Sequence, residues 1–345
     1  MEYTLMGSSG IRISKICLGT MTFGTDWPFG SDKKESREVY HRYLEKGGNF
    51  LDTANLYTET TSEKYLGEFI QESGNRDELV ISSKYSLRTD IGKINNSGNH
   101  RKNLVQTVEG SLKRLKIDYL DLLFLHSWDF TVDVEDVMRS LDILVQQGKV
   151  LHIGFSDTPA WVISRAQTIA KLRGWEPICA LQMEYSLAER SCDREILPMS
   201  DYYNMSFHAW SPLANGILTG KYTKENLPAK VRMTENSKRY NQRNLALGEL
   251  VWDIAKKNNT NGAAVALHWL FTRTPYMVPV IGARNAHQID EQLESLSLNL
   301  PPEDILALDQ ASNIELGFPF DFLDQEHMKQ NLYGSRYKQY DWLKK

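Results

Sequence analysis

The sequence has few cysteines. Cys17, Cys179 and Cys192 lie far apart in a chain of 345 residues and form no Cys-x-x-Cys pair. An odd number of widely separated thiols does not build a disulfide framework, and it favours a reducing compartment. We therefore expect a cytoplasmic protein whose fold depends on its core.

The sequence also lacks long apolar runs and a marked excess of one charge. No run is long enough to span a bilayer, and residues 1–9 have no apolar segment of the kind found in signal peptides. Lys and Arg number 40 against 44 Asp and Glu, which gives a net charge of −4 without blocks of like charge. Nothing here indicates a nucleic acid or a membrane as partner, so we expect a small-molecule substrate.

Metal-binding motifs are absent as well. The eight histidines form no His-x-x-x-His pair and no cluster with the spacing of metal ligands. We therefore expect no catalytic metal.

What the sequence does contain is a regular alternation of strand-like and helix-like segments. The predicted strand and helix pairs are 16–18 with 33–46, 49–52 with 62–72, 79–84 with 103–115, 120–126 with 134–147, 150–156 with 161–172, 180–184 with 193–203, 206–210 with 245–257, and 278–281 with 286–296. Eight such units predict an α/β protein of the (β/α)8 TIM-barrel type. No change of composition interrupts them, so we expect a single domain over residues 1–345.

Three segments lie outside this alternation. Residues 3–6 and 11–14 alternate around a glycine-containing turn and predict an N-terminal β-hairpin. Residues 217–244 are charged and without clear periodicity, which is typical of a functional loop or lid. A helix from 301 to about 312 precedes an aromatic tail that could close a pocket, although docking on the barrel is the preferred interpretation.

Several predicted strands end in residues suited to proton transfer. Asp52 ends the second strand with Tyr57 in the loop beyond it, Lys84 ends the third and His126 the fourth. Buried ammonium groups need a partner, so we expect Lys84 to pair with Asp52 on the neighbouring strand. Each residue alone has an ordinary structural explanation. Because barrels carry their active sites at the carboxyl ends of the strands, the set predicts an active site there.

The order of these motifs resembles the aldo-keto reductases from the hairpin to Gln292. The matching motifs are Asp52-Thr53-Ala54-Asn55-Leu56-Tyr57, Ser83-Lys84, Leu125-His126, Gly148-Lys149-Val150, Ile153-Gly154-Phe155-Ser156, Leu181-Gln182, Glu184-Tyr185-Ser186, Trp210-Ser211-Pro212-Leu213 and Gly220-Lys221. The sequence looks most like the branch that holds general bacterial reductases, aryl-alcohol dehydrogenases and potassium-channel β subunits. The absence of a Gly-x-Gly-x-x-Gly turn agrees with this family, which does not bind its cofactor on a Rossmann turn.

The resemblance implies an NADPH-dependent carbonyl reductase with Asp52, Tyr57, Lys84 and His126 as its catalytic residues. Tyr57 would be the general acid, and the Lys84 cation would lower the pKa of its phenol. Asp52 would hold Lys84 in place, while His126 would orient the substrate carbonyl. A bound nicotinamide would supply the hydride.

The resemblance also implies a set of cofactor contacts. Ser156, Asp157 and Gln182 would hold the nicotinamide carboxamide, and Trp210 would stack on its ring. The full set is Thr20, Met21, Asp52, Ser156, Asp157, Gln182, Trp210, Ser211, Pro212, Leu213, Lys221, Arg232, Gly282, Arg284, Gln288, Glu291 and Gln292. Arg284 and Arg232 offer cations for a 2′-phosphate, so NADP(H) is preferred over NAD(H).

Two of these positions depart from the common family pattern. Many relatives carry Asn where this chain has Asp157 and where it has Gln292. An ionised carboxylate accepts hydrogen bonds but cannot donate one, which changes the contact that Asp157 can make with a carboxamide.

The substrate pocket and two alternative functions remain open at this stage. Trp27, Phe29 and Trp128, with Phe318 and Phe320 of the tail, predict an apolar pocket for aromatic or aliphatic aldehydes and ketones. One alternative is an NADP-binding regulatory or channel-associated subunit with slow turnover. The other is a cofactor-free glycoside hydrolase, which would use facing carboxylates such as Asp52 and Glu184.

Overall fold

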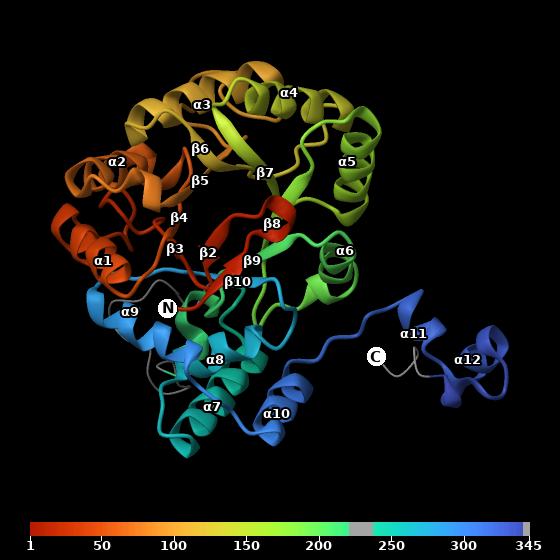
Figure 1. Cartoon of the computed structure of the whole chain (residues 1–345). Coiled ribbons are helices and arrows are strands. Elements are labelled where there is room, and N and C mark those ends of the chain that lie inside the picture. Colours follow the sequence, from red (N-terminus) through yellow and green to blue (C-terminus); the bar gives the residue numbers. More distant parts are fainter. Residues whose placement is uncertain (221–236, 341–345) are drawn as a thin grey trace.

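The chain folds around a closed barrel of eight parallel strands. The computed structural model describes residues 1–220 and 237–340. The strands of the barrel are β3 (Cys17–Gly19), β4 (Phe50–Asp52), β5 (Val80–Tyr85), β6 (Leu120–Leu125), β7 (Val150–Ser156), β8 (Ile178–Glu184), β9 (Ser206–Trp210) and β10 (Met277–Ile281). They pair in chain order, and β10 closes the ring against β3 (Figure 1). The predicted (β/α)8 fold is confirmed.

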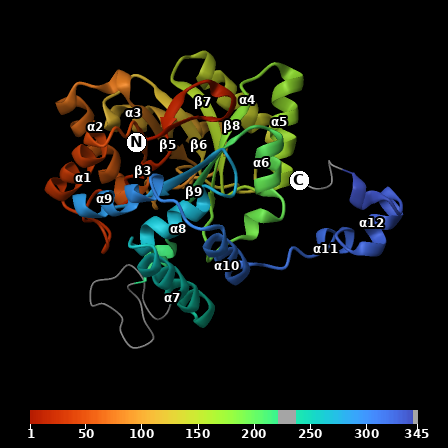
Figure 2. The same cartoon turned by 60° about the horizontal axis from the view of Figure 1, so that its bottom comes forward.

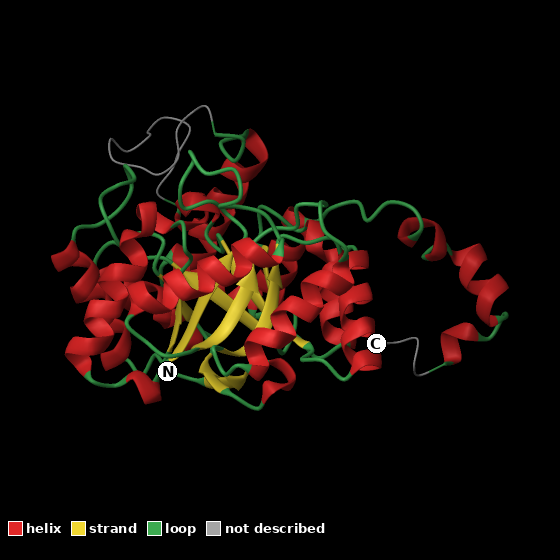
Figure 3. Ribbon diagram, turned by 90° about the horizontal axis from the view of Figure 1, so that it is seen from above, coloured by secondary structure: helices red, strands yellow, loops and turns green. Residues whose placement is uncertain are grey.

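Helices surround the barrel on the outside (Figures 1 and 3). They are α1 (Lys33–Glu45), α2 (Thr61–Ser73), α3 (Arg101–Leu115), α4 (Val134–Gln146), α5 (Ala160–Arg173), α6 (Ile196–Tyr202), α7 (Gln242–Lys257), α8 (Gly262–Leu270), α9 (Ala286–Leu293) and α10 (Pro302–Ser312). Several begin at a side chain that caps the first turn. At α1, for example, Asp32 accepts from the backbone N–H of Glu35 while the Glu35 carboxylate accepts from that of Asp32.

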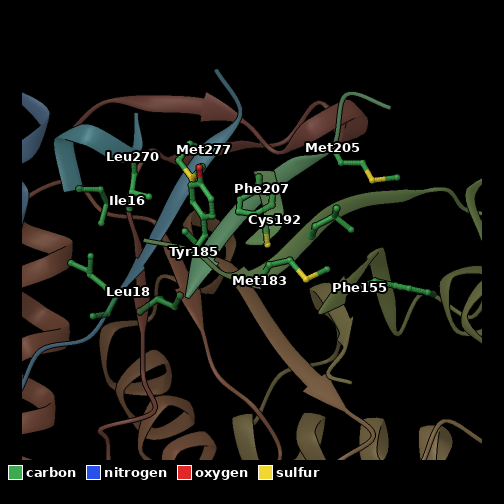
Figure 4. Close-up of a cluster of buried hydrophobic side chains, with 14 of the residues drawn as sticks. Ile16, Leu18, Phe155, Met183, Tyr185, Cys192, Met205, Phe207, Leu270 and Met277 are labelled. Atoms are coloured by element: carbon green, nitrogen blue, oxygen red, sulfur yellow. The ribbon is translucent and has the colours of Figure 1, made fainter. Parts of the chain in front are cut away.

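The strands are apolar because both of their faces are covered. Every residue of β5 and β6 is buried, as expected for parallel strands with side chains inside and helices outside. The outer layer includes Ile16, Leu18 and Phe207, which Figure 4 shows packed between the strands and the neighbouring elements. Phe50 and Phe124 belong to the cluster in the barrel interior.

The predicted hairpin is confirmed and lies across the amino end of the barrel. β1 (Tyr3–Leu5) pairs with β2 (Arg12–Ser14), and a short 3₁₀ helix, η1 (Gly7–Ser9), connects them. Gly7 has φ of 53°, and a Cβ there would lie 2.2 Å from the carbonyl oxygen of Cys179. Only glycine fits this approach, which brings η1 against the start of β8 and leaves the other end of the barrel open for chemistry.

Two predicted helices differ from the structure, and one helix was not predicted. The helix expected at 193–203 is a 3₁₀ turn, η4 (Ser191–Asp193), followed by the shorter α6. The helix expected at 286–296 ends as α9 at Leu293 and continues as the 3₁₀ turn η6 (Glu294–Leu296). Helix α8 was not predicted, because all its residues except His268 are buried and its sequence has no polar face.

The C-terminal tail leaves the barrel after α10. It forms α11 (Phe320–Leu323) and α12 (Glu326–Tyr333), which stand away from the barrel in Figures 1 and 2. The preferred interpretation that the tail docks on the barrel was therefore wrong. Its apolar side chains remain accessible instead, with Phe318 84% exposed.

The described helices are all too short or too polar to serve as a membrane span. The central part of the segment predicted as a loop or lid, residues 221–236, lies outside the described residues.

Candidate active site

A cavity of about 610 Å³ opens at the carboxyl ends of the strands. Its walls carry most of the residues that the sequence predicted for the site. They include Met21, Trp27, Phe29, Asp52, Tyr57, His126, Ser156, Asp157, Gln182, Trp210, Ser211, Pro212, Leu213, Gly282, Arg284, Gln288, Glu291 and Gln292.

Lys84 lies directly beneath this cavity and is buried with its partner. Its Nζ donates to Asp52 Oδ2 at 2.5 Å and to the carbonyl oxygen of Thr53 at 2.8 Å. The second oxygen of Asp52 accepts from Ser82 Oγ at 2.7 Å and from Gln182 Nε2 at 3.1 Å. The predicted pairing of Lys84 with Asp52 is therefore present, and both carboxylate oxygens are satisfied by groups from β5 and β8.

Tyr57 stands over this pair at the start of an unusual turn. The Lys84 Nζ lies 4.9 Å from the centre of the Tyr57 ring. The three residues that follow, Thr58, Glu59 and Thr60, have φ of 45°, 48° and 78°. Such left-handed backbone is unfavourable for non-glycine residues.

The buried Thr58 hydroxyl holds this turn. It donates to the carbonyl oxygen of Phe23 at 2.6 Å and accepts from the backbone N–H of Ser62 at 3.1 Å. Because the turn is fixed at both ends, Tyr57 is presented to the cavity from a rigid position.

Burial and charge act in opposite directions on the ionisable groups of this cluster. Burial raises the pKa of Tyr57, and Lys84 lowers it by less, so the net direction is upward. Burial lowers the pKa of Lys84, but Asp52 and Tyr57 raise it further, so Lys84 stays charged. The sequence predicted a lowered pKa for Tyr57, and the structure differs because the phenol is desolvated as well as placed near a cation. At neutral pH Tyr57 therefore keeps its proton.

His126 faces Tyr57 across the cavity. The two ring centres are 5.9 Å apart with planes at 83°. Burial, and secondly Lys84, hold the pKa of His126 well below its ordinary value, so the ring is neutral and can both donate and accept. Its Nδ1 is buried without a hydrogen-bond partner in the described part of the chain.

The next part of the cavity wall joins Asp157 at the end of β7 to Trp210 at the end of β9. The Trp210 Nε1 donates to Asp157 Oδ1 at 3.0 Å. Arg239 lies over the indole ring, with its Cζ 5.7 Å from the ring centre, and donates through Nε to Glu184 Oε1 at 2.8 Å. These contacts fix the indole at the cavity wall.

The loop after β9 has a backbone suited to an anion. Ser211, Ala214, Asn215 and Gly216 all have positive φ, between 47° and 93°. Successive residues of this kind turn backbone N–H groups toward one side, as in phosphate-binding nests. This loop lines the same cavity as Tyr57.

The far end of the cavity is formed by β10 and α9. Arg284 lines it and has no ion pair among residues 1–220 and 237–340. Gln292 is buried and donates to the carbonyl oxygens of Gly282 and Gln288, whereas its Oε1 is an unsatisfied acceptor within the described residues. The same cavity therefore carries the unsatisfied acceptor of Gln292, the Arg284 cation without an ion pair in the described residues, and a loop suited to a phosphate. Together these groups fit an extended dinucleotide.

Some predicted site residues do not reach this cavity. Thr20 is fully buried and donates to the Asp52 carbonyl oxygen, so it supports the wall from behind. Trp128 is only 8% exposed and packs against Phe130, and it does not line the cavity, nor do the tail aromatics Phe318 and Phe320. Lys221 and Arg232 lie outside the described residues.

Other lining residues were missed. They are Gly19, Thr22, Leu56, Leu87, Asn215, Gly216, Thr219, Trp252, Asn261, Gly262, Ala263, Val280, Ile281 and Ala283. Most lie next to a predicted site residue in the chain, so extending each motif by a few positions would have found them. Trp252 and Asn261 had no signal, because they come from α7 and the start of α8.

A family comparison supports the same assignment. The model of the aldo/keto reductase family matches residues 15–313. The chain belongs to this family. It is therefore an oxidoreductase of carbonyl compounds that uses a nicotinamide cofactor. The predicted family and enzyme class are confirmed.

Three similar proteins come from fungi. The reductase is 39% identical to norsolorinic acid reductase of Aspergillus flavus, over 92% of this chain and 83% of the relative. It is 34% identical to the aldo-keto reductase ausK of Emericella nidulans, over 92% and 83%. It is also 34% identical to aryl-alcohol dehydrogenase [NADP(+)] of Phanerodontia chrysosporium, over 90% and 86%.

The glycoside-hydrolase alternative does not agree with the family or with the geometry. A hydrolase of that kind needs two carboxyl groups that flank the bond to be cleaved. Asp52 is buried against Lys84, and Glu184 is engaged by Arg239. Neither carboxylate is free for this reaction.

Proposed function

We propose that this reductase uses NADPH to reduce aldehydes and ketones, and that Tyr57 supplies the proton. The observation that carries the proposal is the cluster of Tyr57 with the buried Lys84–Asp52 pair and the neutral His126 at one end of the cavity. A bound nicotinamide would supply the hydride.

In this proposal each residue of the cluster has its own part. His126 holds the substrate carbonyl by a hydrogen bond, and Tyr57 protonates the carbonyl oxygen as charge develops on it. Lys84 stabilises the phenolate that remains. Asp52 keeps Lys84 charged and in position. In the direction of alcohol oxidation the same phenolate accepts the proton.

The choice of NADP(H) rests on Arg284 and on a relative. Arg284 lines the cavity and has no ion pair within the described chain, so it is available for a 2′-phosphate. The Phanerodontia chrysosporium relative is named for NADP(+).

The substrate class is proposed from the cavity wall next to Tyr57. Trp27 lies 6.3 Å from Tyr57 between ring centres and 5.8 Å from Phe29. Flat apolar walls of this kind favour aromatic carbonyl compounds. The fungal relatives named as an aryl-alcohol dehydrogenase and a norsolorinic acid reductase support this choice.

Tyr57→Phe is the decisive test. We expect NADPH to bind the variant as it binds wild type, while turnover with a panel of aryl aldehydes falls at least about 10²-fold, because the proton donor is gone. Nucleotide binding is followed by quenching of tryptophan fluorescence, because Trp210 is expected to stack on the nicotinamide ring. Tyr119→Phe, which removes a phenol at the amino end of the barrel, should reduce aldehydes at the wild-type rate.

Two results would contradict the proposal. Full activity of Tyr57→Phe would remove Tyr57 from the role of acid. Tight NADPH binding by wild type without reduction of any aldehyde would favour the regulatory, channel-associated alternative. The same titration with NADH tests the cofactor, because weak NADH binding is expected if Arg284 binds a 2′-phosphate.

A further inference from the structure

Among the described residues near Asp157, the other charged side chains form ion pairs, whereas Asp157 itself forms none. At this end of the cavity Lys84 is paired with Asp52, and Arg239 with Glu184. Asp157 forms no ion pair within residues 1–220 and 237–340, and its side chain accepts from the neutral indole N–H of Trp210. Within this part of the chain, one carboxylate is therefore left without a matching cation.

The position of this carboxylate is fixed by the structure around it. Asp157 has φ of 39°, its backbone N–H donates to the Gln182 carbonyl oxygen at 3.3 Å, and its Oδ1 is held by Trp210. The residue opens onto the same cavity as Tyr57 and Gln182. A side chain anchored in this way cannot turn away into bulk water without giving up its contact with the indole.

We infer that Asp157 makes this reductase bind the oxidised nicotinamide cofactor in preference to the reduced one. The inference rests on the proposed function and on the expectation, from the family resemblance, that the nicotinamide ring stacks on Trp210. The oxidised ring carries a positive charge and the reduced ring is neutral. An unpaired carboxylate beside the ring attracts the first and not the second.

The ionisation of Asp157 makes this preference depend on pH. The pKa of Asp157 is raised to about 6, chiefly because burial disfavours the charged form. The hydrogen bond from Trp210 and the positive charge of Lys84 lower this pKa, whereas the negative charge of Glu184 raises it. Tyr57 and Cys192 are the other titratable groups that interact with Asp157, and both have raised pKa values, so they stay neutral near pH 6. The charge of Asp157 therefore changes between pH 5.5 and pH 8.

The experiment compares the affinities of wild type for NADP⁺ and NADPH across pH 5.5–8, followed by quenching of tryptophan fluorescence. The ratio Kd(NADPH)/Kd(NADP⁺) should rise on the order of tenfold as Asp157 ionises. The 2′-phosphate also titrates near pH 6, but it is common to both nucleotides and does not affect their ratio. In Asp157→Asn we expect a ratio that is low and independent of pH.

Glu291→Gln is the matched control. It removes a carboxylate of α9 that lines the same cavity, so it should change both affinities together and leave their ratio and its pH dependence as in wild type. A role of Asp157 in supporting the cavity wall alone would likewise change both affinities in parallel.

A second measurement needs no variant. Binding of NADP⁺ to wild type at pH 6 should release more protons than binding of NADPH, measured by calorimetry in buffers of different ionisation enthalpy. A wild-type ratio that does not change with pH, equal proton release, or an unchanged ratio in Asp157→Asn would overturn the inference and leave the proposed function intact. Failure of both nucleotides to bind would overturn both.

Discussion

Lys84 illustrates how a single residue can serve stability and chemistry together. Its ammonium is fully buried, and it is tolerated because Asp52 and the Thr53 carbonyl oxygen accept from it. Removal of one member of such a pair leaves an uncompensated charge in the protein interior, which costs more than removal of both.

We therefore expect Lys84→Met to lower the free energy of unfolding by about 3–5 kcal/mol. The double variant Lys84→Met/Asp52→Asn should recover part of that loss, because no charge is left unpaired. Unfolding by urea measures both. The contrary result would be that Asp52→Asn lowers the free energy of unfolding by the same amount in Lys84→Met as in wild type. The two residues would then be uncoupled, and this account of the pair would be wrong.

At the scale of elements, glycines decide how closely two helices approach. A Cβ at Gly67 in α2 would lie 2.5 Å from the carbonyl oxygen of Arg114 at the end of α3. The backbone there cannot move without separating the helices. At Gly110 in α3 the nearest atom is the end of the flexible Arg114 side chain, at 2.9 Å.

Gly67→Ala should therefore destabilise the protein by about 1–3 kcal/mol through overpacking. Gly110→Ala is the matched control, since alanine has the higher helix propensity by about 1 kcal/mol and only a side chain must move. Thermal unfolding of the two variants provides the comparison. Equal melting temperatures would show that the contact between α2 and α3 is not as rigid as the Gly67 geometry indicates.

The elements also show what sequence alone could predict. The barrel strands were predictable because parallel strands are apolar and end in polar residues, and this brought Asp52, Lys84 and His126 to one rim. Helix α8 was not, because a helix buried on all sides has no amphipathic period. The net direction of the Tyr57 pKa was missed for a similar reason, since the sequence shows which charge is near but not how much water is excluded.

Trp252 is a residue of the site that could not be predicted from the sequence. It lines the cavity from α7, and no strand-end rule points to a residue in the middle of a helix. Asp157 was identified as a departure from the family pattern. That it has no cation partner among residues 1–220 and 237–340 could be recognised only from the structure, in which Lys84 and Arg239 pair with Asp52 and Glu184.

At the scale of the whole molecule, the tail is separable from the barrel. No hydrogen bond or ion pair joins residues 317–339 to the described residues up to 316. Helices α11 and α12 contact each other, and Glu326 of α12 accepts from the Tyr337 hydroxyl. In contrast, α10 is tied to the barrel by Trp269 and Arg273, which donate to Asp309.

A chain that ends at residue 316 should therefore keep the melting temperature and the NADPH affinity of the full chain. Calorimetry and the fluorescence titration measure these two quantities. A chain that ends at residue 300, without α10, should melt at a clearly lower temperature. Loss of stability on removal of the tail alone would mean that its exposed apolar side chains are covered in solution.

The closure of the ring also determines the order in which the protein can be made. Leu18 of β3 pairs with Ile281 of β10, so the first strand of the barrel must wait for the last barrel strand before its free edge is covered. β4 and β5 are neighbours, and Asp52 can meet Lys84 early during translation. The nascent sheet nevertheless keeps two open edges on the ribosome, and such edges are prone to aggregate. We therefore expect newly made chains to be most prone to aggregation before β10 has emerged.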